Sequence, residues 1–273
     1  MSETAFVGTE DDGYDWGRAA ADGFQSVAQY WRTVPNDAWK GPTGASEWNM
    51  RVLADHITGE AVWFANLVRG VTAHEDPLPG KIYEEMKAWP IERLAGAVEE
   101  SGEALRSAIG EAGPDAMRAT VDMGFEKLPL WRATYVSLAE AAFHGWDARV
   151  GRDPEATIPR DWALQLVRGI EWFAPSVAHR AAAERGPGHY LLRVGDEVGP
   201  ITVAVEDGSI ALQPGEVGQP EVAMSLTADQ FVRLIAGRLD LGRLIERGAV
   251  RVEGDSVRVP VLQRIFRGIA NGD

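Results

Sequence analysis

The chain contains no cysteine, so it can form neither a disulfide nor a thiolate metal site, and it has no cysteine nucleophile. It also lacks any apolar run long enough for a helix to span a bilayer. Basic residues are few, with 27 Lys and Arg against 41 Asp and Glu, and the net charge is −14. We therefore expect neither nucleic acid nor an anionic membrane as a partner.

The chain has the composition of a globular protein, with 45% hydrophobic residues. Its 273 residues are enough for one large domain or two ordinary ones. Residues 1–20 are acidic and show neither the basic segment nor the apolar segment of a secretory signal. Together with the absence of cysteine, this favours a cytoplasmic location.

Apolar residues in the first two-thirds of the chain recur at spacings of three and four, which is typical of amphipathic helices. The expected helices are 12–34, one that begins after Asn49 as its N-cap, 90–109, 131–150 and 159–185. Pro35 ends the first of them, and Pro175 bends or interrupts the last. Four or five helices of these lengths predict an up-and-down four-helix bundle.

The pattern changes after ERGPGH at 184–189, which has the composition of a linker. Apolar residues then alternate, and the segments expected to form strands are 189–195, 200–214 with a hairpin turn at EDGS, 220–226, and a strand pair in 249–260. Thr227 is expected to cap a helix over 228–238. The prediction is a two-domain α+β protein, with a helical bundle at 1–186 and a small α/β sandwich at 187–273.

Three metal-type ligands fall on expected helices: His56 in DHITGE, and Glu140 and His144 in LAEAAFHGWD. Glu140 and His144 are four positions apart, which places them on one helical face. Two imidazoles and a carboxylate form a three-ligand set for a divalent metal, with a fourth position open as in catalytic sites. Alternatively, Glu140 pairs with an arginine and His144 is a hydrogen-bonded core histidine. The spacing alone does not decide between the two.

Four neighbours of this trio have two possible roles each. Glu60, one turn beyond His56, is either a general base or a buried partner of an arginine. Asp147 either fixes the tautomer of His144 or makes a hydrogen bond near the helix end. Trp48 and Trp146 flank the trio, and we expect them to pack around the site rather than to contact a substrate.

The segments WNMRVLADHI at 48–57 and LAEAAFHGWDARVG at 138–151 resemble the mycothiol-dependent maleylpyruvate isomerase family. The shared features are a Trp before the helix cap, R-x-L-x-x-H, and E-x-x-x-H-x-W-D followed by Gly. The N-terminal domain of that family is a DinB-like four-helix bundle that binds a divalent metal, usually zinc. The resemblance assigns the ligand roles to His56, Glu140 and His144.

The C-terminal segments VEDGSIAL, LTADQFVRLIAGRLDLGRLIERGAVRVEGD and VLQRIF are similar to the sterol-carrier-protein-2-like (SCP2-like) fold, which the same family carries. There, an Arg in a Gly-Arg element is tied to activity, and Arg238 is the matching position. The N-terminal-domain arginine used by the isomerase has no match here. This departure favours a broader thiol-transferase description over that one isomerase.

The resemblance implies that mycothiol supplies a metal-bound thiolate nucleophile, since the chain has no thiol of its own. In an isomerase this thiolate adds to a conjugated cis double bond and leaves after rotation; in a transferase it stays on the product. The implied partners are a small-molecule substrate and the thiol. Two other hypotheses remain: an SCP2-like carrier of apolar small molecules with a non-catalytic bundle, and a metal-binding bundle that has lost its catalysis.

Overall fold

The computed structural model describes residues 8–70, 84–124 and 126–267. By its contacts, the chain divides into two compact units, with the division between Ile158 and Pro159. Within the described ranges, no helix is both long enough and apolar enough to cross a membrane.

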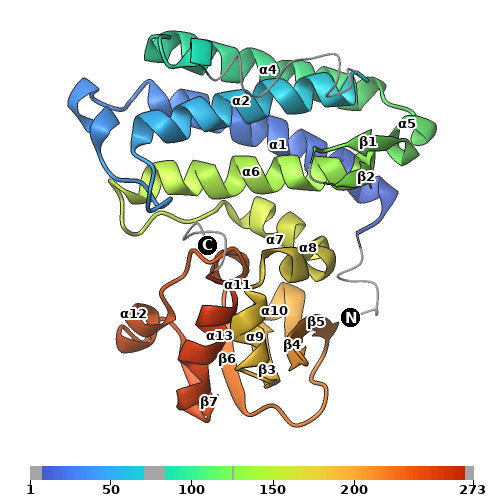
Figure 1. The fold of residues 1–273 in the computed structure, drawn as a ribbon, viewed down its shortest axis with the longest axis vertical. Coiled ribbons are helices and arrows are strands. Elements are labelled where there is room, and N and C mark those ends of the chain that lie inside the picture. The colour runs from blue at the N-terminus through green and yellow to red at the C-terminus, as the bar shows by residue number, and fades with distance from the viewer. Residues whose placement is uncertain (1–7, 71–83, 125, 268–273) are drawn as a thin grey trace. The chain divides into compact units, whose positions relative to one another are not determined.

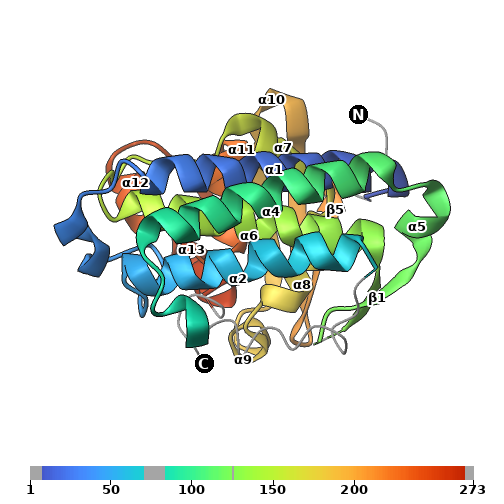
Figure 2. The ribbon, with the colours of Figure 1, turned by 90° about the horizontal axis from the view of Figure 1, so that it is seen from above.

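The first unit is built from four long helices that lie side by side (Figures 1 and 2). These helices are α1 Glu10–Trp31, α2 Met50–Val68, α4 Ile91–Glu111 and α6 Leu130–Val150. Both α1 and α2 pack against α4 and α6. The shorter elements of this unit are η1 Asn36–Lys40, α5 Pro114–Arg118 and the antiparallel strands β1 Thr120–Asp122 and β2 Lys127–Pro129.

The helices follow an up-down-down-up order. Thr134 near the start of α6 donates a hydrogen bond to the carbonyl of Gly13 near the start of α1, so these two helices are parallel. Arg51 at the start of α2 donates to the carbonyl of Trp89 just before α4, so these two are also parallel, and they run opposite to α1 and α6 (Figure 1). The four-helix bundle is as predicted, whereas its helix directions differ from simple up-and-down alternation.

In the first unit, the predicted helices and the predicted cap of α2 are confirmed. The N-cap Asn49 accepts a hydrogen bond of 3.0 Å from the backbone N–H of Val52, which satisfies one of the free donors at the start of α2. On α1, the apolar residues predicted to face inward include Trp16 and Phe24, both fully buried. The ring of Trp16 packs edge-on against Tyr135 of α6, with 5.0 Å between the ring centroids.

The second unit is a five-stranded sheet with helices. Its strands are β3 Gly188–Val194, β4 Gly199–Glu206, β5 Ser209–Pro214, β6 Val222–Leu226 and β7 Arg251–Gly254, in the order β5-β4-β3-β6-β7. Only the β3–β6 pair is parallel. Its helices are α7 Arg160–Arg168, α8 Ile170–Val177, α9 Arg180–Glu184, α10 Gly195–Val198, α11 Ala228–Ile235, α12 Leu241–Glu246, η2 Ser256–Arg258 and α13 Val259–Ile265.

Two local predictions for this unit are confirmed. The hairpin turn at EDGS joins β4 to β5, and both Asp207 and Gly208 have positive φ, as the right-handed twist of a two-residue hairpin requires. Thr227 caps α11, where its hydroxyl accepts a hydrogen bond of 3.2 Å from the backbone N–H of Gln230.

Other local predictions are corrected. The single bent helix expected over 159–185 is instead three helices, α7 to α9, and the first break falls at Gly169 rather than near Pro175. The strand pair expected in 249–260 is one strand, β7, which pairs with β6, because residues 256–258 form a 3-10 turn.

The predicted two-domain α+β class is confirmed. The division by contacts lies before the boundary predicted at residue 186, because α7 packs against α11 and α8 packs against β5.

Candidate metal centre

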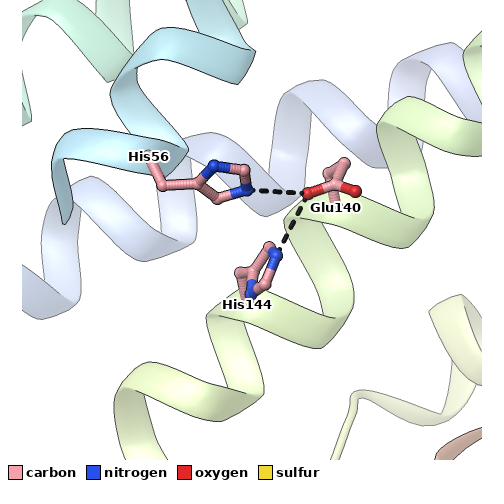
Figure 3. A group of neighbouring side chains, drawn as sticks. All are labelled: His56, Glu140 and His144. Carbon is pink, nitrogen blue, oxygen red and sulfur yellow. Dashed lines mark hydrogen bonds and ion pairs between the residues drawn. The ribbon is translucent and has the colours of Figure 1, made fainter. Parts of the chain in front are cut away.

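The structure brings His56, Glu140 and His144 together inside the bundle, as predicted (Figure 3). The Nε2 atoms of both imidazoles lie 3.2 Å from Oε2 of Glu140. The possible ligand atoms of the three residues all lie within 4.8 Å of one another. Their side chains keep 12–29% of their surface exposed, so the cluster is reachable from outside the core.

The spacing of these atoms fits a divalent ion. Ligands at about 2.0–2.2 Å from a tetrahedral zinc lie about 3.3 Å from each other, close to the 3.2 Å that separates Glu140 Oε2 from each imidazole nitrogen. The set of two nitrogens and one carboxylate oxygen is that of catalytic zinc sites and of non-haem iron sites. Within the described ranges this is the single group of three or more His, Asp or Glu side chains with such spacing.

Asp147 fixes the orientation of His144. Its side chain is fully buried, and its Oδ2 lies 2.8 Å from Nδ1 of His144. A proton on Nδ1 donates to this carboxylate, so Nε2 is the nitrogen of His144 that can bind a metal once it is deprotonated. The structure therefore shows Asp147 in contact with His144 itself.

The ionisation of Glu140 and His144 is shifted in opposite directions. Burial alone would raise the pKa of the Glu140 carboxyl, but the imidazoles of His144 and His56 outweigh burial and hold this pKa below its ordinary value. Burial would likewise lower the pKa of His144, but Glu140 and Asp147 raise it to about 9. Without a metal, the cluster is therefore an ion pair with His144 protonated.

The other three residues predicted near the site differ in whether they contact the candidate ligands. The ring of Trp48 contacts both histidines, with centroid distances of 4.7 Å to His56 and 5.6 Å to His144. Trp146 is buried and donates from Nε1 to the carbonyl of Ala156, so it packs beside the site as predicted. Glu60 is half-buried on α2 and does not belong to the ligand cluster.

Arg238 lies in the second unit, in the turn after α11. It is half-buried, and its Nη1 donates a hydrogen bond of 3.1 Å to the carbonyl of Ala236. The structure therefore groups the three metal-type ligands in one unit and places Arg238 in the other.

The sequence interpretation missed the segment that covers the site. Gly44 donates from its backbone N–H to the carbonyl of Asp147 at 2.9 Å, which joins the loop before α2 to the end of α6. The composition GPTGAS at 41–46 indicates a turn, but nothing local in it identifies α6 as the element it contacts.

The fold and the cluster together define the class: a four-helix bundle with a three-ligand metal-type centre, followed by a separate α+β unit. Residues 20–149 match the mycothiol maleylpyruvate isomerase N-terminal domain model, and residues 172–267 match the SCP-2 sterol transfer family. The first unit therefore resembles the mycothiol-dependent maleylpyruvate isomerase family and the second resembles the SCP-2 family, as the motifs predicted.

Solved structures show a similar fold. A crystal structure of the mycothiol-dependent maleylpyruvate isomerase is 18% identical and superposes with a TM-score of 0.56. The match covers 85% of this chain and 93% of that one, and a histidine-to-alanine mutant of the same enzyme gives the same values. This likeness establishes a shared fold. No curated protein matches the chain in a sequence comparison.

Proposed function

We propose that the protein is a divalent-metal enzyme that uses a small-molecule thiol, mycothiol, as its nucleophile. The reaction is either S-transfer to an electrophilic small molecule or a maleylpyruvate-isomerase-like cis–trans isomerisation. We also propose zinc as the metal and the cytoplasm as the location. The observation that carries the proposal is the His56–Glu140–His144 cluster, whose three donor atoms converge within a bundle that matches this family.

The cluster residues and Asp147 have distinct proposed roles. His56, Glu140 and His144 would hold the ion, and Asp147 binds Nδ1 of His144 so that Nε2 is the nitrogen that faces the ion. A metal bound there would lower the pKa of a coordinated thiol and so supply a thiolate. The thiol comes from a small molecule because the chain has no cysteine. The partly exposed ligand side chains leave access for that thiol.

The decisive assay uses metal-loaded protein, mycothiol and a panel of electrophiles that includes maleylpyruvate. We expect turnover of at least one electrophile, and loss of turnover when the thiol is omitted or the metal is removed. Turnover of maleylpyruvate without net consumption of thiol identifies the isomerase, and stoichiometric loss of free thiol identifies the transferase. Metal-dependent turnover that continues without any thiol contradicts the proposal, because water would then be the nucleophile.

We propose that Arg238, which lies in the second unit, is required for the same reaction. We expect Arg238→Ala to lower kcat by about 10²-fold or more, as removal of one group that stabilises transition-state charge does, with the bound metal unchanged. Arg243→Ala is the matched control, because Arg243 is an exposed arginine on the neighbouring helix α12. Equal activity of the Arg238→Ala and Arg243→Ala proteins would rule out this role.

An apolar carrier is the alternative function, and one observation favours it. The second unit has a pocket of about 380 Å³, in which the apolar residues Ile245, Val252, Val259 and Pro260 lie among the polar or charged residues Asp240, Glu246, Ser256, Gln263 and Arg267. This volume lies within the range of about 300–1,000 Å³ typical of small-molecule sites. A carrier would copurify with an apolar ligand whether or not metal is bound, and would show no thiol-dependent turnover.

A further inference from the structure

The segment between η1 and α2 forms a closed loop, which we call the 42–48 loop. Its two ends are joined by a β-bridge between Pro42 and Asn49. Inside it, the hydroxyl of Thr43 lies 2.7 Å from the carbonyl oxygen of Trp48, to which it donates. The backbone N–H of Trp48 donates to the carbonyl of Ala45 at 2.9 Å. These bonds give Trp48 a defined place relative to the first residue of α2.

The 42–48 loop is held against α6 at Asp147. The N–H of Gly44 donates to the carbonyl of Asp147, and a Cβ at position 44 would lie 2.5 Å from Oδ1 of the same residue. A Cβ at Gly151, the residue after α6, would lie 2.1 Å from the carbonyl oxygen of Pro42. Because real Cβ atoms do not approach so closely, both glycines are needed for this contact.

The loop places one indole ring against ligands from two helices. Trp48 is half-buried and tilted over both imidazoles, at 4.7 Å from the ring of His56 on α2 and 5.6 Å from that of His144 on α6. The two imidazoles are themselves in edge contact at 4.7 Å. The indole of Trp48 and the two imidazoles therefore pack together as one cluster of three rings.

Asp147 connects this packing to the tautomer of His144. Its side chain accepts the Nδ1 proton of His144, and its main-chain carbonyl accepts the N–H of Gly44. One buried residue thus fixes a ligand and the loop that covers that ligand. The ring of His56 contacts Oε2 of Glu140, the ring of Trp48 and the ring of His144.

We propose that Trp48 is a positioning residue of the metal centre. The 42–48 loop, anchored on Asp147, holds the indole against His56 and His144 so that both Nε2 atoms stay directed at Glu140. Groups that orient metal ligands from outside typically contribute about 10–100-fold to metal affinity. This inference rests on the proposed metal site and is independent of which thiol or electrophile is used.

The test compares Trp48→Ala and Trp48→Phe with the parent protein and with Trp89→Ala. Trp89 is a half-buried tryptophan of the same unit whose ring is covered by Arg93 instead of a ligand. Gly44→Ala is a second variant, because its new Cβ would push the loop away from Asp147 without removing the indole. Three quantities are measured: zinc affinity by competition with a chromophoric chelator, the visible spectrum of the Co²⁺-substituted protein, and the thermal midpoint of the metal-free protein.

We expect Trp48→Ala and Gly44→Ala each to weaken zinc binding by about 10–100-fold and to change the Co²⁺ spectrum. Trp48→Phe should keep most of the affinity, since a phenyl ring can pack on the imidazoles. Trp89→Ala should leave zinc affinity and spectrum unchanged even if it lowers the thermal midpoint, which separates positioning from general stability.

Parent-like affinity and spectrum in Trp48→Ala would overturn the positioning role while leaving the metal site intact. An equal loss of affinity in Trp89→Ala would also overturn it, because the effect would then be one of stability. A parent protein that binds no metal overturns the proposed function itself, so the two failures are distinguishable.

Discussion

Replacement of His144 by Ala should abolish stoichiometric metal binding. Two ligands remain, and the loss should exceed the roughly 10–100-fold cost of removing an outer-shell partner. Glu140→Gln should have the same effect while nearly preserving shape, because it removes the negative charge that both imidazoles face at 3.2 Å. The measurement is metal content of protein purified without chelator, followed by titration with zinc.

Thermal stability provides a second measurement of the same prediction. A ligand present at 100 times its Kd stabilises a protein by about 2.7 kcal/mol, which for a domain of 150–250 residues is a rise of about 5–10 °C in Tm. A chelator should therefore lower the Tm of the parent by about this amount and leave the Tm of His144→Ala unchanged. If the three residues form only an ion pair and bind no metal, the chelator should leave the Tm of the parent unchanged.

Glu60→Gln is the matched control for Glu140→Gln. Glu60 is a half-buried glutamate one turn beyond His56, but it is not part of the ligand cluster. We expect the Glu60→Gln protein to retain the full metal content. Loss of metal in Glu60→Gln together with retention in Glu140→Gln would show that the ligand set has been assigned wrongly.

The three candidate ligands could be found from the sequence because helical periodicity fixes which residues share a face. Glu140 and His144 are four positions apart on the helix α6, so their common direction follows from helical geometry. The approach of His56 to them depends on packing of α2 against α6, which no local pattern encodes. The family resemblance supplied that pairing, and the structure confirms it.

The features that the sequence did not predict depend on contacts between residues distant in sequence. The up-down-down-up order follows from which helices touch, and apolar spacing gives each helix a face but no neighbour. The 42–48 loop shows the same limit: its turn residues are recognisable, whereas the close approach of Gly44 to Asp147 is visible only in three dimensions. In 249–260 the alternating pattern was read as two strands, but the partner of β7 is β6.

Metal affinity should rise steeply with pH between about 7 and 9. The pKa of His144 is raised to about 9, so at pH 7 this imidazole is protonated in the metal-free protein. The ion can bind only after that proton leaves, and each pH unit below the pKa therefore weakens binding about tenfold. A histidine with an ordinary pKa of 6.5 would give nearly constant affinity over the same range.

The loss of the His144 proton on metal binding can be measured directly as proton release. Calorimetric titration of the metal-free protein with zinc at pH 7.5, in buffers of different ionisation enthalpy, should show about one proton released from His144 per ion bound. Asp147→Asn should reduce the release at this pH, because its carboxylate is one of the groups that raise the pKa of His144. If the parent binds zinc without releasing a proton and its affinity is constant from pH 7 to 9, His144 is not protonated in the metal-free protein.

The same ionisation predicts how the metal-free protein responds to pH. Because folding raises the pKa of His144, its contribution to stability is complete below the unfolded value of 6.5 and is lost as the pH rises through about 9. Bound zinc reverses this dependence, since the metal-binding form of His144 is the deprotonated one. The thermal midpoints of the metal-free and zinc-loaded proteins should therefore diverge as the pH increases from 6.5 to 9, and parallel curves would exclude His144 as a ligand.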